Sequence, residues 1–458
     1  MRVLKALSLL VFVALAGLAG WLRLAPPDLV RVASGYSAKI VCSNVFLTDR
    51  DPQKVLEVDV QTHGHPLLTV MNVSVDREAG VVRSGLFGLF GKGLALHREG
   101  QGCATVPDGD LPAARAVPAM PPHDPMAAGD GLWPLGEEVE PLGNAALAAA
   151  LDDPALTGPG MRAVVVVKDG RIVGERYGDG FDAETRLLGW SMAKTVTASV
   201  IGTLVREGRL SLDDRELISA WDDARGDVAL SDMLGMASDI AWNEGYGSVS
   251  DVTRMLYLEP DMAGFAASKP LDEMTPGGVG DEFNYSSGTT VMLSRIWQDT
   301  FGDPGEALAW PRKALFDPLG MRSAVFETDA RGTFVGSSYL YATGRDWARF
   351  GQFLLQRGVW NGRSLLPVGY VDWMAEPHPA SKGEYGRGHV WLSQPKHYLP
   401  GPNAELPADA FHAQGHDGQS VSIIPSENLV VVRLGLTPNE FGYKPGHLLQ
   451  AVITALRD

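Results

Sequence analysis

Two β-hairpin patterns, one near each end of the region from residue 144 to residue 458, constrain the fold of this chain most strongly. Each pattern has two apolar runs of strand length joined by a short polar turn, and the first turn contains the hairpin-favouring pair Asp169-Gly170. The expected strands are Ala163–Val167, Ile172–Tyr177, Ser420–Ile424 and Leu429–Leu434. Between them lies a helical subdomain from about residue 203 to 350. The sequence therefore predicts an α+β fold with one antiparallel sheet closed by N- and C-terminal strands.

The tetrad Ser191-Met192-Ala193-Lys194 stands at the start of an amphipathic helix. Apolar residues recur at helical spacing and a glycine ends the pattern: Ala193, Val196, Val200, Leu204 and Gly208. Residues three apart share a helix face, so the Lys194 amine can reach the Ser191 hydroxyl. A desolvated, neutral lysine can accept the serine proton and make the hydroxyl a nucleophile. The other interpretation is a simple N-cap at Ser191 with a solvated Lys194.

Two later segments carry further candidate chemistry. Tyr285-Ser286-Ser287 precedes a helical run from Thr289 to Gln298, so a tyrosine beside a cation could pass a proton. The alternative there is a buried tyrosine with Ser287 as the helix cap. Gly415-His416-Asp417-Gly418-Gln419 precedes a strand, where a glycine admits a substrate against the backbone and the next N–H can bind an oxyanion. The alternative is a plain hairpin turn.

Together, in the order Ser-x-x-Lys, Tyr-x-Ser, His-x-Gly, these segments resemble the serine β-lactamase and D-alanyl-D-alanine peptidase superfamily. They are most similar to the branch of class C β-lactamases, related esterases and 6-aminohexanoate-dimer hydrolase. Four more stretches resemble segments of that branch: 230–238, 243–246, 318–321 and 342–351. The resemblance covers residues 145 to 458 and implies a β-lactamase-like fold with a helical subdomain.

The resemblance also implies a mechanism. Ser191 attacks a carbonyl to form an acyl-enzyme, and Lys194 and Tyr285 hold and pass its proton as one titrating unit. The backbone N–H groups of Ser191 and Gln419 bind the oxyanion, the latter because Gly418 matches the third-motif glycine. The mechanism requires neither a metal nor another cofactor.

The substrate expected is a small amide or ester. Penicillin-binding enzymes usually carry a lysine where His416 stands, and class C β-lactamases an asparagine where Ser287 stands, so the attraction for a substrate carboxylate is weaker here. Candidates for an apolar acyl pocket, or for the core, are the aromatic residues Trp190, Trp242, Tyr246 and Trp391, with Tyr246 facing the substrate in the related hydrolase. The alternatives are a β-lactamase or D,D-peptidase, and a non-catalytic ligand-sensing envelope protein.

Charge excludes one class of partner. The formal net charge is −16, so we expect no nucleic-acid partner, because phosphates would be repelled. The oligomeric state is left open by the sequence.

The N-terminal third is expected to contain three parts. Residues 1–23 form a signal peptide or a membrane anchor, since Arg2 and Lys5 precede an apolar run that ends at Arg23. Residues 24–110 form a β-rich unit, with strands expected at 55–60, 67–75 and 81–86, and residues 111–143 form a linker or strap before the hydrolase domain at 144–458. An export signal favours a disulfide between Cys42 and Cys103 over two buried free thiols. The expected location is periplasmic or otherwise extracytoplasmic, with anchoring in the inner membrane as an open alternative.

Overall fold

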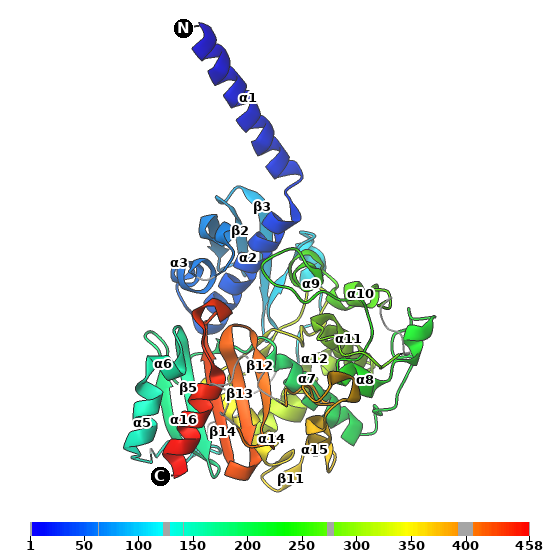
Figure 1. Cartoon of the computed structure of the whole chain (residues 1–458). Coiled ribbons are helices and arrows are strands. Elements are labelled where there is room, and N and C mark those ends of the chain that lie inside the picture. The colour runs from blue at the N-terminus through cyan, green and yellow to red at the C-terminus, as the bar shows by residue number, and fades with distance from the viewer. Residues whose placement is uncertain are drawn as a thin grey trace.

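A five-stranded antiparallel sheet joins both predicted hairpins. The computed structural model describes residues 2–62, 64–121, 129–140, 142–272, 279–392 and 406–457. The strand order is β12-β13-β14-β5-β6, and Val431 pairs with Val166 where the two hairpins meet (Figure 1). The strands are β5 (Met161–Lys168), β6 (Arg171–Tyr177), β12 (Phe411–Gly415), β13 (Gln419–Ile424) and β14 (Leu429–Gly435). The α+β prediction is confirmed.

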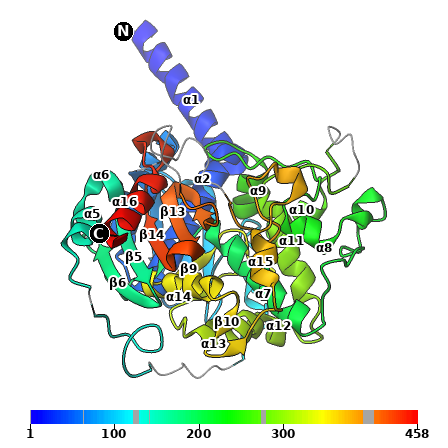
Figure 2. The same cartoon turned by 60° about the horizontal axis from the view of Figure 1, so that its bottom comes forward.

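Helices cover both faces of this sheet, which explains the unbroken valine run of β5. Val165 and Val167 point into the larger core, beneath α14 (Gly344–Leu355), while Val164 and Val166 point into a second core on the opposite face. Figure 2 shows α14 on one side and three other helices on the other side. Those three helices are α5 (Ala145–Asp152), α6 (Pro154–Thr157) and α16 (Pro445–Arg457).

A helical region lies beside β12 and carries the candidate nucleophile (Figure 1). Its helices are α7 (Met192–Arg206), α8 (Leu230–Leu234), α9 (Asp251–Leu258), α10 (Met262–Ala267), α11 (Ser287–Gln298), α12 (Pro304–Pro311), α13 (Asp317–Leu319) and α15 (Tyr370–Ala375). The small strands of this region are β7 (Leu187–Leu188), β8 (Val325–Phe326), β9 (Leu340–Ala342), β10 (Val359–Trp360) and β11 (Arg363–Ser364). Helix α7 contacts β12, so the helical region meets the sheet where the first and third motifs lie.

The N-terminal part combines one long helix with a four-stranded sheet. The sheet has the order β1-β2-β3-β4, and α2 packs across it. The elements are α2 (Asp28–Thr48), α3 (Pro52–Val55), β1 (Met71–Asp76), β2 (Val81–Leu86), β3 (Phe90–Arg98), β4 (Gly102–Thr105) and α4 (Leu111–Arg115). The β-rich description therefore lacked its longest buried element, α2.

The strand predicted at 55–60 is wrong, because that segment is helical through α3 and a π-helical turn at Leu56–Gln61. Asp51 caps α3 by accepting the Lys54 N–H at 2.8 Å, and Pro52 occupies the first turn. The buried apolar residues of the segment lie on one helical face. The apolar residues of this segment thus form one face of an amphipathic helix and not the inward face of a strand. The strand predicted at 67–75 is also shortened, since Pro66–Val70 is a 3-10 helix.

Helix α2 joins the N-terminal part firmly to the rest of the chain. Lys39 forms a fully buried ion pair with Glu327, and Ser43 Oγ donates to the same carboxylate at 2.9 Å. Cys42 and Cys103 form the predicted disulfide, so the free-thiol alternative is wrong. The domain boundaries at residues 24, 110 and 143 stay predictions.

In the part of the expected strap that the structure describes, the backbone is held by hydrogen bonds from α14. Arg349 of α14 donates to the backbone carbonyls of Pro134 at 3.0 Å and Gly136 at 2.8 Å. Trp133 is also buried, so residues 129–140 lie against α14.

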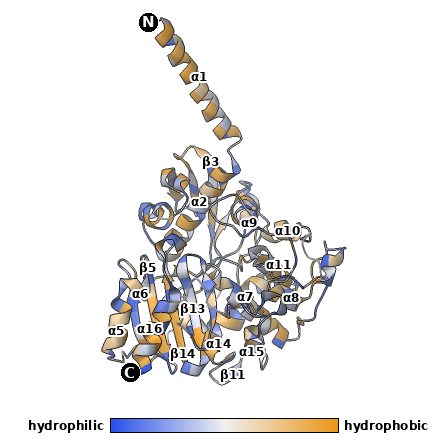
Figure 3. Cartoon of the chain, viewed as in Figure 1, coloured by the Kyte–Doolittle hydropathy of each residue, from blue (hydrophilic) through white to orange (hydrophobic). Residues whose placement is uncertain are grey.

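Helix α1 (Arg2–Leu24) touches β3 at its base, extends away from the rest of the protein and is almost entirely apolar (Figures 1 and 3). Its segment Val3–Leu24 is long and apolar enough to cross a membrane, and none of its most apolar stretch is buried in the protein. A secretory signal sequence has the same properties.

Candidate active site

Ser191 stands on a tight turn between β7 and α7. The preceding residue, Trp190, is buried and has a left-handed φ of 48°, and the Ser191 carbonyl accepts the Lys194 N–H at 3.0 Å. In the described part of the chain the Ser191 hydroxyl makes no capping hydrogen bond to α7. The simple N-cap interpretation is therefore wrong, and the hydroxyl is available for chemistry.

Lys194 is 1% exposed, so the solvated-lysine alternative is wrong as well. Its Nζ donates to Ser191 Oγ at 3.1 Å, to Ser287 Oγ at 3.0 Å and to the Ser337 carbonyl at 3.0 Å. Burial lowers the pKa of Lys194 to about 8, and the charge of Glu244 opposes that decrease. With this pKa about a tenth of the molecules carry a neutral Lys194 at pH 7, and that fraction increases as the pH rises, as a general base requires.

Tyr285 lies on the other side of the same amine. Lys194 Nζ is 4.8 Å from the centre of the Tyr285 ring. Burial raises the pKa of Tyr285 above its ordinary value, and a hydrogen bond with the Ser191 side chain opposes that rise. The phenol therefore stays protonated at neutral pH, so it can relay a proton but is the weaker candidate for the resting base.

The Tyr285 loop is held by Asp239, which directly follows the segment 230–238. The buried Asp239 carboxylate accepts the backbone N–H groups of Gly280 and, at 3.1 Å, of Glu282. The Asn284 N–H is bonded to the Met236 carbonyl at 2.9 Å. Asp239 thus fixes the backbone that delivers Tyr285.

The cap of α11 is Ser286, whose Oγ accepts the Thr289 N–H at 3.0 Å. The prediction that Ser287 could be this cap is wrong. Ser287 Oγ instead accepts from Lys194 and donates to Glu244 Oε1 at 2.5 Å.

Glu244 is the functional candidate that the sequence did not single out. Its carboxylate accepts the Ser287 hydroxyl, the Ser287 N–H at 2.9 Å and the Trp242 Nε1–H at 2.6 Å. It lies in the segment 243–246, which had been interpreted only through its tyrosine, Tyr246. An acidic side chain in a motif-bearing loop was the available signal, but only the tertiary contact with Ser287 gives it meaning.

The third motif approaches the nucleophile through a different glycine from the one predicted. A Cβ atom on Gly415 would lie 2.2 Å from the Gly189 carbonyl oxygen, so only glycine allows β12 to lie against the Ser191 turn. Gly418 has a φ of 82° and faces Arg433 and Tyr443 instead. Gly415, and not Gly418, therefore lies against the nucleophile turn.

The Gln419 side chain is bonded to the neighbouring strand and not to the Ser191 turn. Its side-chain amide bonds the backbone N–H and carbonyl of Gly435 on the neighbouring strand, and the residue is buried. The assignment of the second oxyanion N–H to Gln419 depended on the Gly418 match and loses its basis.

Three of the four aromatic candidates lie around the motifs. Tyr246 packs on His416 with 4.8 Å between ring centres, and Trp190 meets the same imidazole at 5.7 Å. The ring centres of Trp391 and Tyr285 are 5.3 Å apart. Trp242 is the exception, because its ring packs against Gly288 and its Nε1–H is used in the bond to Glu244.

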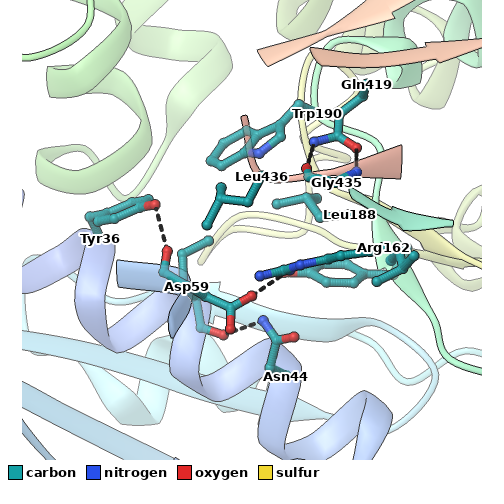
Figure 4. Close-up of a pocket in the computed structure, with 12 residues that line it drawn as sticks. Tyr36, Asn44, Asp59, Arg162, Leu188, Trp190, Gln419, Gly435 and Leu436 are labelled. Carbon is teal, nitrogen blue, oxygen red and sulfur yellow. Dashed lines mark hydrogen bonds and ion pairs between the residues drawn. The ribbon is translucent and has the colours of Figure 1, made fainter. Parts of the chain in front are cut away.

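A small cavity lined by both polar and apolar side chains lies behind the nucleophile turn, between α2 and the sheet (Figure 4). Its volume is about 30 Å³, and its walls include Trp190, Gln419 and the Asp59–Arg162 ion pair. Such a space holds about one water molecule and is far below the size of a ligand site. Helix α2 therefore supports the Ser191 turn from behind. Among the residues that the structure describes, no group of three His, Cys, Asp or Glu side chains is arranged to hold a metal.

The Beta-lactamase family model matches residues 149–445, which is more than half of the chain. A 6-aminohexanoate-dimer hydrolase of Paenarthrobacter ureafaciens is 27% identical over 226 residues, which are 46% of this chain and 56% of that protein. The chain thus aligns with little more than half the length of this curated relative.

Two solved structures share the fold. A putative 6-aminohexanoate-dimer hydrolase from Bacillus anthracis has a TM-score of 0.52 at 22% identity, covering 65% of this chain and 78% of that chain. A penicillin-binding protein homologue from Caulobacter crescentus has a TM-score of 0.51 at 17% identity, covering 69% and 99%. With the ordered serine, lysine and tyrosine, the fold and the family match lead to one conclusion: this chain belongs to the Beta-lactamase family of serine hydrolases.

Proposed function

We propose that this protein hydrolyses a small amide or ester through an acyl-enzyme on Ser191. The observation that carries the proposal is the 3.1 Å contact between Lys194 Nζ and Ser191 Oγ inside a buried environment. Burial lowers the lysine pKa to about 8, which makes the amine an effective base close to neutral pH.

The proposed sequence has two halves. Neutral Lys194, together with Tyr285, takes the Ser191 proton while Oγ bonds to the substrate carbonyl carbon. The bond from that carbon to the leaving nitrogen or oxygen then breaks, and the leaving group receives the proton through the same pair. Water next attacks the acyl carbon while its proton passes through Tyr285 to neutral Lys194. The bond from that carbon to Ser191 Oγ then breaks, the acid product leaves, and the proton returns from Lys194 to Ser191 Oγ.

The oxyanion is proposed to lie between two backbone donors. The Ser191 N–H stands at the start of α7, where the helix dipole favours negative charge. The second donor is proposed to be the N–H of His416, the residue after Gly415, in place of Gln419. Support comes from the contact that Gly415 makes with the turn bearing Ser191.

The charges near the site favour a substrate without a recognised carboxylate. With Gly415 as the motif glycine, the position two residues earlier, where a lysine would attract an anion, is held by the uncharged Ala413, and the nearby His416 Nε2 lies 3.3 Å from Asp417 Oδ1. The Glu244 carboxylate adds negative charge close to Lys194. Tyr246, 38% exposed, and the His416 side chain, 40% exposed, offer an aromatic surface for an uncharged acyl chain. A linear amide like that named for the Paenarthrobacter relative fits these features.

We place the catalytic region outside the cytoplasm, with α1 as signal or anchor. The disulfide supports this location, because such bonds persist in oxidising compartments.

Turnover of three substrates tests the proposal: p-nitrophenyl butyrate, the 6-aminohexanoate linear dimer and the β-lactam nitrocefin. We expect ester and amide turnover by the parent protein, none by Ser191→Ala, and normal turnover by the control Ser211→Ala, whose serine is exposed. Nitrocefin as the fastest substrate would instead assign a β-lactamase. Absence of turnover together with covalent labelling of Ser191 would assign a ligand-sensing protein.

A further inference from the structure

The turn between β2 and β3 exposes two large apolar side chains side by side. Phe87 is 58% exposed and Leu89 is 61% exposed. Hydrogen bonds from Gly88 N–H to Gly85 O, 2.9 Å, and from Leu89 N–H to Leu86 O, 3.0 Å, hold the turn in shape. Single exposed apolar residues are ordinary, whereas two on the tip of one ordered turn call for a partner.

This turn lies where α1 leaves the folded protein. A Cβ atom on Gly91, just after the turn, would lie 3.1 Å from the Val30 carbonyl at the start of α2. Helix α1 itself contacts β3, and Figure 1 shows the β2–β3 end of the sheet at the foot of α1. Trp21, 52% exposed in the last turns of α1, adds an aromatic residue of the kind enriched at membrane interfaces.

Two basic side chains flank the same end of the sheet. Arg83 and Lys92 are exposed and border an open groove of about 610 Å³ on the sheet face. Neither forms an ion pair with any residue that the structure describes. The carboxylate at the groove rim, Asp108, is paired with Arg331 at 2.5 Å. Unpaired positive charge here contrasts with the net charge of −16.

We propose that the β2–β3 turn docks on the lipid bilayer beside α1. Phe87 and Leu89 enter the interfacial layer, and Arg83 and Lys92 meet the phosphates of anionic lipids. This proposal depends on α1 remaining attached as a membrane span. If α1 spans the membrane, the membrane surface lies at the last helical turn of α1. The β2–β3 turn lies beside that helical turn, which identifies the bilayer as its partner.

The docked turn gives the catalytic region a fixed orientation. Only Ala25-Pro26-Pro27 separates α1 from α2, and a single tether of this length would let the protein tilt. A second contact through β2 and β3, which pack on α2, removes that freedom. The Ser191 turn, supported by the same helix, is then held at a constant height above the membrane.

Fluorescence of the full-length protein in vesicles tests this docking. Both native cysteines are in the disulfide, so Leu89→Cys supplies a single free thiol for a nitrobenzoxadiazole label. The matched control is Val368→Cys, at a residue that is 98% exposed. Vesicles contain phosphatidylcholine alone or with phosphatidylglycerol, plus nitroxide-labelled lipid as quencher. We expect a blue shift and quenching at residue 89 and neither at residue 368.

Two further measurements separate the parts of the proposal. Co-flotation with the vesicles reports insertion of α1, so a failed anchor is distinguished from an undocked turn. In the Arg83→Glu and Lys92→Glu background we expect quenching at residue 89 to fall in anionic vesicles and to stay unchanged in neutral ones. Flotation without quenching at residue 89 would overturn the docking, and insensitivity to both charge reversals would overturn the role of the lipid phosphates.

Discussion

The Glu244 carboxylate and the Lys194 amine are joined by one hydroxyl group, that of Ser287. Ser287 Oγ donates to Glu244 Oε1 at 2.5 Å and accepts from Lys194 Nζ at 3.0 Å. Burial acts on Lys194 in one direction, lowering its pKa, and the nearby negative charge acts in the other. The balance of these two effects sets the pH at which Ser191 becomes a nucleophile.

The pH profile of acylation follows from this balance. We expect kcat/KM for p-nitrophenyl butyrate to rise with pH around 8, because Lys194 must lose its proton before it can act as base. Glu244→Gln removes a charge that raises the lysine pKa, so the rise should move to lower pH, by roughly one unit. A stopped-flow profile of both proteins measures the shift.

The control for that profile is Glu384→Gln, which removes an equally negative but exposed side chain. Its profile should coincide with that of the parent protein. A shift to higher pH in Glu244→Gln, or equal shifts in both variants, would refute the role given to Glu244.

Tyr285→Phe removes the proton relay and keeps the ring. We expect kcat to fall by about 10²–10⁴-fold, the usual contribution of a positioned acid or base. Tyr385→Phe is the matched control, because its ring packs 5.9 Å from Tyr285 without contacting Lys194 in the described structure. Steady-state kinetics of both variants, with circular dichroism as a check of folding, decide the point; equal rate losses would mean that the phenol of Tyr285 has no special role.

The Lys39–Glu327 pair holds α2 to the hydrolase region and is completely buried. Glu327→Ala leaves the Lys39 amine without its carboxylate, and we expect a loss of about 3–5 kcal/mol in the free energy of unfolding. Asp372→Asn, which breaks an exposed pair with Arg357, should change it by less than about 1 kcal/mol. Urea titration of both variants measures the difference, and similar values would show that the buried pair contributes no more than a surface pair.

The disulfide between Cys42 and Cys103 closes a loop with a sequence separation of 61 residues. Loop entropy alone predicts a stabilisation of about 4 kcal/mol for a loop of this size. The double variant Cys42→Ala, Cys103→Ala should therefore unfold at a lower urea concentration than the oxidised parent. A parent protein that is equally stable with and without reductant would contradict this expectation.

Much of the fold was predictable because the residues that specify each hairpin and helix are neighbours in the sequence. The valine run of β5 and the Asp169-Gly170 turn define a hairpin from neighbouring residues alone. The helix after Ser191 was likewise given by its apolar spacing. Helix α2 was missed because it is buried on several sides and has only a weak amphipathic pattern.

The site was predictable where a motif carries the chemistry and not where tertiary contacts do. Ser191, Lys194 and Tyr285 lie together as the motifs indicated. The choice between Gly415 and Gly418 depends on which glycine meets the Gly189 carbonyl, and no sequence spacing reports that contact. The role of Glu244 likewise arises from a bond to Ser287, 43 residues away.

Intact-mass spectrometry during reaction with p-nitrophenyl butyrate tests the central claim most directly. The account predicts a transient acyl adduct on the parent protein, mapped by peptide digestion to Ser191, and no adduct on Ser191→Ala. An adduct that persists in Ser191→Ala, or ester turnover at the parent rate by that variant, would contradict the assignment of Ser191 as the nucleophile.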